Sequence, residues 1–157
     1  MMEYAVAIGS NKGDRAGTLT RAAGLVSADG RVAVLRVSPL LENPALGGPP
    51  GQQDFLNGAW IVATGLGPHQ LLRRLQQVED QLGRVRSVRD GPRTCDLDLV
   101  LAADGRCVSS SVLTLPHPRM CERAFVLQPL AAVAPDWRHP TTGHTIRQLW
   151  QRLQAEA

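Results

Sequence analysis

The chain has 157 residues, of which 43% are hydrophobic, and this length suffices for one domain, residues 1–157, with its own buried core. The net charge is only +3 and 16 of the 17 basic residues are arginine, which fits discrete anion sites better than a nucleic-acid-binding surface. The three cysteines are scattered and form no C-x-x-C pair, which disfavours a disulfide framework or zinc knuckle and favours a reducing cytoplasm. No apolar run approaches the ~18 to 20 residues of a membrane span. We therefore expect a cytoplasmic domain with no membrane or nucleic-acid partner.

The first part of the chain alternates predicted strands and helices. Apolar runs predict strands over 4–8 and 32–41, and the helical spacing of apolar residues between them predicts a helix over 18–28. The turn at 9–14 is not a P-loop, because the G-x-x-x-x-G-K-[ST] pattern occurs nowhere in the chain. Residues 42–53 contain three Gly and three Pro, which predicts a long loop, and such loops in compact domains often have a function.

The second part continues the alternation. We expect a strand over 55–64, an amphipathic helix over 68–82, and a buried strand that starts near Asp96 and ends at a hairpin turn, Asp104-Gly105, before Cys107. A short helix should end before Pro129, and a terminal helix should span 146–153. This order predicts an α+β fold with a ferredoxin-like β-α-β-β-α-β core, additional C-terminal helices and α/β/α layers.

The segment before the last predicted strand combines arginines with carboxylates. Its arginines are Arg84, Arg86, Arg89 and Arg93. Asp96 and Asp98 follow at i and i+2 of the strand, so their side chains point to one face with Cα atoms about 6.6 Å apart. Magnesium prefers oxygen ligands and usually keeps one or two carboxylates plus substrate phosphates. Arginine forks match phosphate oxygens. The segment therefore predicts a cation and phosphate site, whereas either feature alone would indicate only a solvated surface.

These residues resemble the signature of the 6-hydroxymethyl-7,8-dihydropterin pyrophosphokinase family, which moves pyrophosphate from ATP to a pterin alcohol in folate biosynthesis. The resemblance covers nearly the whole chain in the family's order. Its motifs are Ala-Ile-Gly-Ser-Asn at 7–11, Asp-Phe-Leu-Asn at 54–57, Gly-Pro-Arg-Thr at 91–94, Asp-Leu-Asp at 96–98, Leu-Pro-His-Pro at 115–118 and Arg-Ala-Phe-Val-Leu-Gln-Pro-Leu at 123–130.

The resemblance implies a site for each substrate and a Mg²⁺-dependent transfer between them. Two Mg²⁺ ions would be held by Asp96 and Asp98. The catalytic residues would be these two aspartates together with Arg86, Arg89 and Arg93. ATP would be bound by Gln76, Glu79, Arg84, Arg86, Arg89, Arg93, Thr114, His117 and Arg123. The reduced pterin alcohol would be bound by Gly9, Asn43, Pro44, Leu46, Phe55, Asn57, Asp96 and Phe125.

The chain departs from the family pattern at three positions. Asn43 and Ala45 replace family residues in a Thr-Pro-Pro-Leu-like stretch that lines the pterin site, whereas Pro44 and Leu46 match it. Asp90 stands where the family commonly has an aromatic residue, which predicts a looser closed state. We expect a monomer that acts on small molecules.

Two other function classes share some of these features. An arginine-rich loop on a ferredoxin-like sheet could bind RNA through exposed aromatics, but aromatic residues are only 4% of this chain and no RNP-like pair is present. Another two-metal nucleotidyl transferase would share the carboxylates, but it would not explain Phe55, Asn57 and Phe125. An assay for AMP formed from ATP and the pterin alcohol would separate these classes.

Overall fold

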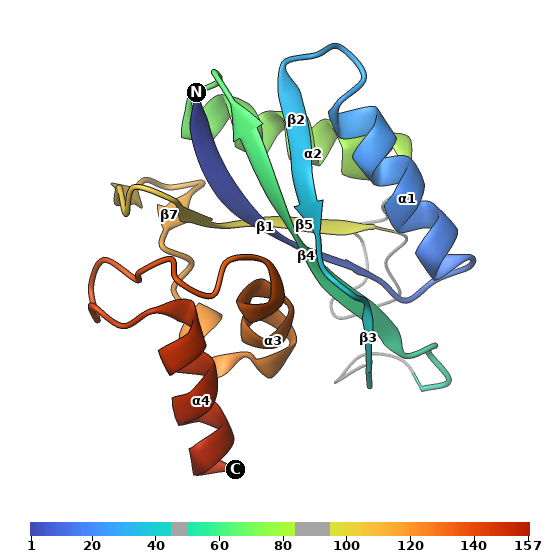
Figure 1. Ribbon diagram of the computed structural model, residues 1–157. Helices are drawn as coiled ribbons and strands as arrows, with labels where there is room; N and C mark the ends of the chain where they lie inside the picture. The colour runs from blue at the N-terminus through green and yellow to red at the C-terminus, as the bar shows by residue number, and fades with distance from the viewer. Residues whose placement is uncertain (45–49, 84–94) are drawn as a thin grey trace.

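The computed structural model describes residues 1–44, 50–83 and 95–157. An antiparallel sheet lies at its centre (Figure 1). The strands are β1 (Met2–Ser10), β2 (Val32–Val37), β3 (Leu41–Asn43), β4 (Phe55–Thr64) and β5 (Asp96–Ala102). Their order is β2-β4-β1-β5, and β3 also pairs with β4. β2 and β5 thus lie at opposite edges of the sheet, and β1 lies between β4 and β5.

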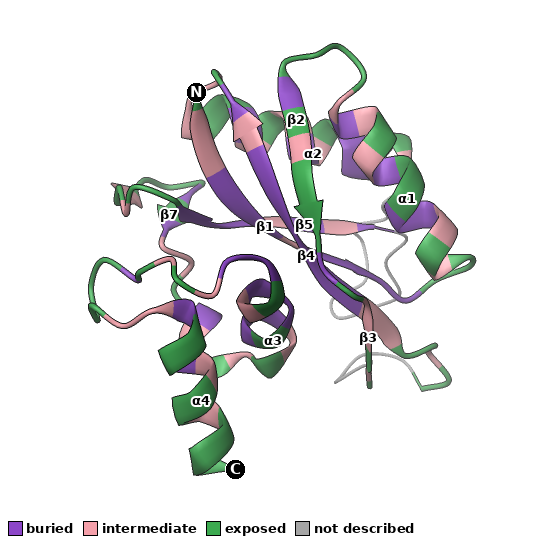
Figure 2. Cartoon of the chain, viewed as in Figure 1, coloured by how far each residue is buried: buried purple, intermediate pink, exposed green. Residues whose placement is uncertain are grey.

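Helices cover both faces of this sheet. One face packs against α1 (Arg15–Val26) and α2 (Pro68–Gln81), around a core that includes Tyr4, Trp60 and Leu75. The other face packs against α3 (Ala124–Val133), and α4 (Ile146–Glu156) packs in turn against α3. Figure 2 shows buried residues along β1 and β4 between the two helical layers. The mixed helix and sheet architecture confirms the predicted α+β class.

The predicted strand over 32–41 is two strands. β2 ends at Val37, and Ser38-Pro39 separates it from β3 because proline has no backbone N–H for the ladder. The Ser38 N–H donates to the Ala59 carbonyl over 2.9 Å, and the Ala59 N–H donates to Ser38 Oγ over 2.8 Å. The side chain of Ser38 thereby replaces a backbone acceptor at the break. Because β3 pairs with β4, the predicted loop over 42–53 also begins too early.

The prediction that the third helix ends before Pro129 is wrong, because α3 continues to Val133 with Pro129 inside it. An internal proline costs about 3 kcal/mol, since it removes a hydrogen bond and crowds the preceding turn. Four buried neighbours, each contributing roughly 1.5 to 3 kcal/mol, outweigh this cost. They are Val126, Leu127, Leu130 and Val133.

The turn at Asp104-Gly105 is present, with Gly105 at φ 75° and its N–H bonded to the Ala102 carbonyl over 3.0 Å. However, the strand after it does not pair with β5. Instead β6 (Val108–Ser109) pairs with β7 (Thr114–Leu115) in a separate ribbon. The β5 edge is covered at Val100, whose carbonyl accepts the His117 N–H over 2.8 Å.

Candidate active site at the edge of the sheet

Asp96 and Asp98 open the edge strand β5, at the predicted i and i+2 positions. Asp96 pairs with Gly9 of β1, and Asp98 pairs with Ala7. Directly paired residues of an antiparallel ladder share a face, and this face carries Ala5 further along β1, which packs in the α3 core. Because of this pairing, both aspartates lie on the α3 side of the sheet, at its edge. Both are half-buried there.

Glu79 holds the backbone between the two aspartates. Its side chain comes from the last turns of α2, the residue is only 2% exposed, and Oε2 accepts the Leu97 N–H over 2.8 Å. A buried hydrogen bond to a carboxylate is stronger than one between neutral groups. The contact satisfies an outward-facing donor of the edge strand, and it positions Asp96 and Asp98 on either side of Leu97.

A cleft of about 390 Å³ lies between α2, β5 and the β6–β7 ribbon. Five residues that sequence reasoning assigned to ATP or to metal line it together. They are Gln76, Glu79, Asp98, Thr114 and His117. Sequence reasoning missed Leu72 and the ribbon tip, residues 110–113, which also line the cleft. Leu72 precedes Gln76 by four residues on one helix face, so the helical period alone could have included it.

His117 reaches the cleft from the chain that follows β7. Its Nδ1 accepts the Arg119 N–H over 3.2 Å, so the neutral imidazole carries its hydrogen on Nε2 and can donate there. Burial lowers the pKa of His117 below its ordinary value of 6.5, and the positive charges of Arg123 and Arg119 lower it further. His117 is therefore a neutral hydrogen-bond donor at neutral pH.

A second group of predicted residues lies on the neighbouring strands. Gly9 pairs with Asn57 of β4 on one side and with Asp96 of β5 on the other. A Cβ atom on Gly9 would lie 2.8 Å from Asn57 Nδ2 and 3.6 Å from the Phe55 ring, so both side chains occupy the space over the glycine. Phe55 and Asn57 thus share a face, as the strand period predicts.

The amide of Asn57 is buried with an unused acceptor. Asn57 is 8% exposed, and its Nδ2 is 3.5 Å from the Ile8 carbonyl. Its Oδ1 has no hydrogen-bond partner among the described residues. Leaving a buried acceptor unpaired costs about 1 to 3 kcal/mol, which a ligand that donates a hydrogen bond would recover.

Arg123 and Phe125 lie together at the start of α3. The guanidinium carbon of Arg123 is 5.5 Å from the centroid of the Phe125 ring, within the range of a cation–π contact. Phe125 is half-buried and packs against the α3 core, which lies over the face that carries Asp96 and Asp98. The contact therefore restrains Arg123 near the site.

Of the remaining predicted residues, the structure describes Asn43 and Pro44. Asn43 is half-buried and pairs with Phe55, whereas Pro44 is exposed. The other assigned positions lie outside the described residues. They are Ala45, Leu46, Arg84, Arg86, Arg89, Asp90 and Arg93.

The carboxylate pair has the donor chemistry of a magnesium site. Within the ranges 1–44, 50–83 and 95–157, no three His, Cys, Asp or Glu side chains form a metal-binding cluster. Two hard oxygen donors that leave coordination positions for phosphate oxygens are what Mg²⁺ uses in nucleotide enzymes. Asp96 and Asp98 are therefore the residues that could hold it.

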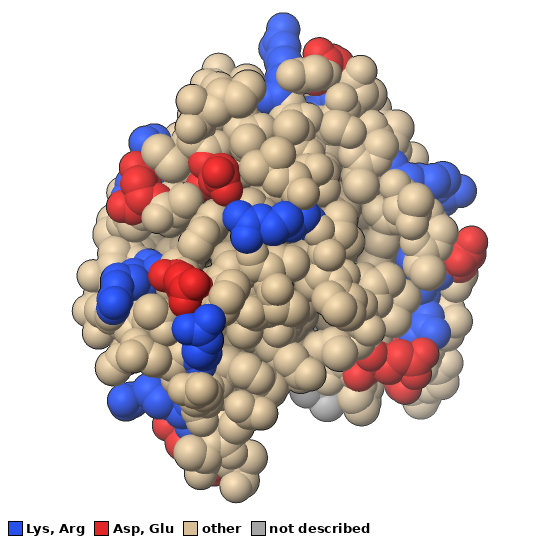
Figure 3. Space-filling model, in the orientation of Figure 1, with Lys and Arg blue, Asp and Glu red and all other residues tan. Residues whose placement is uncertain are grey.

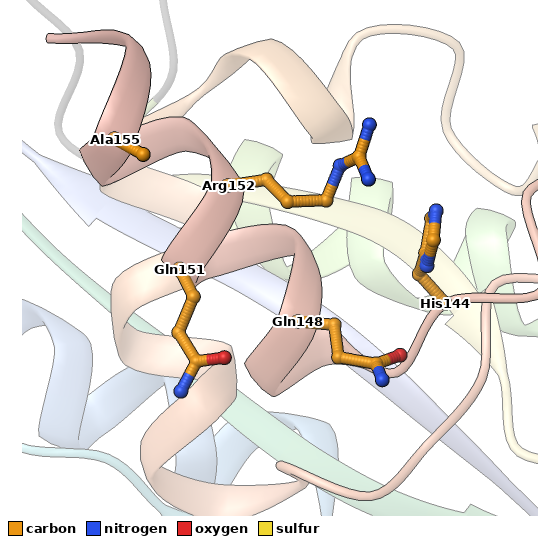
Figure 4. Close-up of a pocket in the computed structure, with 5 residues that line it drawn as sticks. All are labelled: His144, Gln148, Gln151, Arg152 and Ala155. Atoms are coloured by element: carbon orange, nitrogen blue, oxygen red, sulfur yellow. The ribbon is translucent and has the colours of Figure 1, made fainter.

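Two surface features lie apart from this site. The face in Figure 3 carries acidic and basic side chains interspersed, without a large area of one sign. A hollow of about 330 Å³ on α4, shown in Figure 4, contains none of the predicted residues. Its lining residues are His144, Gln148, Gln151, Arg152 and Ala155.

No helix in the described parts of the chain has the length and apolar character to cross a membrane.

In the α+β fold, the paired carboxylates at the start of β5 lie between a polar cleft and a buried amide. Residues 5–135 match the family model of 7,8-dihydro-6-hydroxymethylpterin-pyrophosphokinase, HPPK, and the chain belongs to this family.

Named relatives agree with this membership. Three are called 2-amino-4-hydroxy-6-hydroxymethyldihydropteridine pyrophosphokinase. The protein from Synechocystis is 39% identical over 97% of this chain and 76% of its own length. The Bacillus subtilis protein is 44% identical over 82% of this chain and 75% of its own length. The Methylorubrum extorquens protein is 42% identical over 93% of this chain and 90% of its own length.

Solved structures share the fold at low identity. A structure of HPPK-DHPS in complex with substrates has a TM-score of 0.75 and 11% identity, covering 99% of this chain and 46% of that one. The HPPK-DHPS of Plasmodium falciparum has a TM-score of 0.70 and 14% identity, covering 99% of this chain and 44% of that one. This chain thus spans less than half of these two proteins.

Proposed function

We propose that this chain transfers pyrophosphate from ATP to the hydroxymethyl group of 6-hydroxymethyl-7,8-dihydropterin, releasing AMP, in folate biosynthesis. Family membership supports the activity. One observation supports the location: the start of β5 puts Asp98 in the cleft and Asp96 beside Gly9, which in turn pairs with Asn57. The two substrates would therefore meet at the carboxylate pair.

The pterin would bind against the side chains of Asn57 and Phe55. A pterin ring has adjacent hydrogen-bond donors and acceptors on one edge, and an amide offers a matching acceptor and donors. The unpaired Oδ1 of Asn57 would accept from this edge, and the two aromatic rings, Phe55 and Phe125, would contact the ring faces. Because Gly9 has no Cβ atom, the side chains of Asn57 and Phe55 can lie directly over it.

ATP would bind in the cleft with its phosphates at Asp98. His117 would donate from Nε2 to a phosphate oxygen, and Arg123 would supply positive charge nearby. The predicted roles of Arg84, Arg86, Arg89 and Arg93 on the phosphates complete this proposal. Bound at Asp96 and Asp98, Mg²⁺ would neutralise charge on the phosphoryl groups.

The transfer is a single displacement. The pterin hydroxymethyl oxygen forms a bond to the β-phosphorus of ATP and loses its proton to solvent, and the bond from that phosphorus to the α–β bridging oxygen breaks, so AMP leaves with that oxygen. The protein contributes chiefly by holding the two reactants in line and by stabilising charge. Glu79 acts indirectly, because its hydrogen bond to Leu97 sets the position of both aspartates.

We also propose that the chain has a ferredoxin-like core. The order β2-β4-β1-β5 with two helices on one face of the sheet supports this fold. We further propose a cytoplasmic monomer that acts on small molecules.

Product analysis tests the proposed reaction. The protein is incubated with ATP, Mg²⁺ and the reduced pterin alcohol, and the products are separated and weighed by mass spectrometry. Pyrophosphoryl transfer yields AMP and a pterin that carries two added phosphates. Release of pyrophosphate with an adenylylated pterin would show nucleotidyl transfer instead and would refute the proposal. Omitting Mg²⁺ should abolish the reaction.

A further inference from the structure

One face of α2 forms a wall of the cleft. Leu72, Gln76 and Glu79 line it, and their spacing of four and three residues places them on one side of the helix. His69 lies three residues before Leu72 in the first turn, on the same side. It therefore continues this helix face beyond the residues that line the cleft.

His69 contacts the opposite wall of the cleft. Its Nε2 is 2.9 Å from Oγ of Ser110, 41 residues away in the chain. Ser110 begins the tip of the β6–β7 ribbon, which lines the cleft through residues 110–113. The contact is thus a bridge between the two walls.

Ser110 also organises the ribbon tip. Its Oγ accepts the Leu113 N–H over 3.1 Å, and its own N–H donates to the Leu113 carbonyl over 2.9 Å. The Ser110 hydroxyl also lies 3.2 Å from this carbonyl, and the tautomer of His69 decides whether the imidazole or the hydroxyl donates in the contact between them. A constraint on Ser110 is therefore passed to the whole tip.

The bridge lies at the end of the cleft remote from the aspartates. Glu79 bonds to Leu97, next to Asp98, and His69 is ten residues earlier on α2, which is about 15 Å along the helix axis. We propose that His69 is a positioning residue for ATP, which holds the ribbon tip at the width that fits the nucleoside. The inference depends on the proposed placement of the phosphates at Asp98.

The first experiment compares ATP with inorganic tripolyphosphate, which has no nucleoside. His69→Ala should raise KM for ATP roughly twofold to tenfold, the range of one net hydrogen bond, with KM for the pterin and kcat nearly unchanged. Inhibition by tripolyphosphate should be unchanged. His69→Gln should restore much of the affinity, because its amide can donate to or accept from Oγ of Ser110. Equal weakening of tripolyphosphate and ATP would refute the proposal.

Matched controls separate this inference from the cleft assignment. His144→Ala removes another histidine, in the hollow on α4, and should leave KM for ATP unchanged. His117→Ala should raise KM for ATP. If His117→Ala does so and His69→Ala does not, the bridge has no role but the cleft assignment stands. If neither variant changes KM for ATP, the cleft assignment fails and the inference fails with it.

A double-mutant cycle tests the contact itself. Ser110→Ala should raise KM for ATP, and adding His69→Ala to it should have less effect than His69→Ala has alone, because the bridge is already absent. Fully additive effects on KM would refute a direct role of the His69–Ser110 contact.

Discussion

The proposed pterin side of the site lies on three adjacent strands, whereas the proposed ATP side lies between a helix and a ribbon. On the strands, Asn57, Gly9 and Asp96 are in direct register, so their relative positions follow from the backbone ladder. Around the cleft, the spacing depends on side-chain bonds such as Glu79 to Leu97 and His69 to Ser110. The geometry of the pterin side is thus fixed by the backbone ladder, whereas the geometry of the ATP side can be changed by removing single side-chain contacts.

The largest effect is expected where the two sides meet. Asp98→Asn should lower kcat by about a thousandfold or more, because it removes the charge of a proposed magnesium ligand, and a bound metal supplies several kcal/mol of transition-state stabilisation. The fold should remain, since Asp98 is half-buried at the edge of the sheet. Steady-state assays and circular dichroism measure both properties.

Asp104→Asn is the matched control. This aspartate is exposed, and it pairs with Arg106 over 3.1 Å in the turn after β5. Its loss should leave turnover within about twofold, as for an exposed ion pair. Near-normal turnover in Asp98→Asn with Mg²⁺ would contradict the metal assignment.

The next effect separates the two substrates. Asn57→Ala should weaken pterin binding by ~1 to 3 kcal/mol, because the pterin edge then lacks its partner in a buried site, while ATP binding should change little. Isothermal titration calorimetry with each ligand measures both affinities. Equal losses of affinity for the pterin and for ATP would contradict the assignment of Asn57 to the pterin site.

Gly9→Ala tests the proposed pterin side through the backbone position that lies under Asn57. The added Cβ would lie 2.8 Å from Asn57 Nδ2, so the buried amide would have to move. We expect a loss of pterin affinity in the same direction as for Asn57→Ala, with a smaller effect on ATP. An unchanged pterin affinity would show that pterin binding does not depend on the position of the Asn57 amide over Gly9.

A smaller effect concerns the shape of the ATP side. Glu79→Ala should lower the free energy of unfolding by ~1 to 3 kcal/mol, because the Leu97 N–H loses its buried acceptor, and kcat should fall as the aspartates shift. Urea denaturation measures the stability. Glu79→Gln retains an acceptor oxygen, so its free energy of unfolding and its kcat should lie between those of Glu79→Ala and of the native chain. A Glu79→Gln variant that is less stable and less active than Glu79→Ala would contradict the positioning role.

The smallest effect depends on pH. Because the folded-state pKa of His117 is below 6.5, the unfolded chain binds this proton more readily. The contribution of His117 to stability is therefore complete above about pH 6.5 and declines as the pH falls toward the folded-state value. Burial lowers the pKa of His139 as well, so His139 adds a decline of the same sign.

Unfolding free energies at pH 5 and pH 7.5 test this prediction. His117→Asn keeps a side-chain acceptor for the Arg119 N–H but cannot titrate, so it should reduce the fall in stability between the two pH values. The remaining fall would come from His139 and other groups. An equal fall in the variant and the native chain would contradict the lowered pKa of His117.

Local periodicity was sufficient for much of the secondary structure. The alternation around Asp96 and Asp98 predicted β5, and the helical spacing from Leu71 to Val78 predicted α2, because each element buries one side of a regular backbone. It failed where tertiary packing outweighed a local rule. The burial of apolar residues in α3 retains Pro129 inside the helix, and Ser38 replaces a backbone acceptor between β2 and β3.

The sequence by itself determined the family and the α+β class, because motifs and period-2 or helical patterns are properties of short segments. Only the tertiary structure decided that Gly9 lies between Asn57 and Asp96, that Glu79 bonds to Leu97, and that His69 reaches Ser110. These contacts join residues that are 18 to 87 positions apart, as 79 and 97, and 9 and 96, illustrate. Such pairings depend on strand order and on how the helices pack across the sheet, which no local pattern specifies.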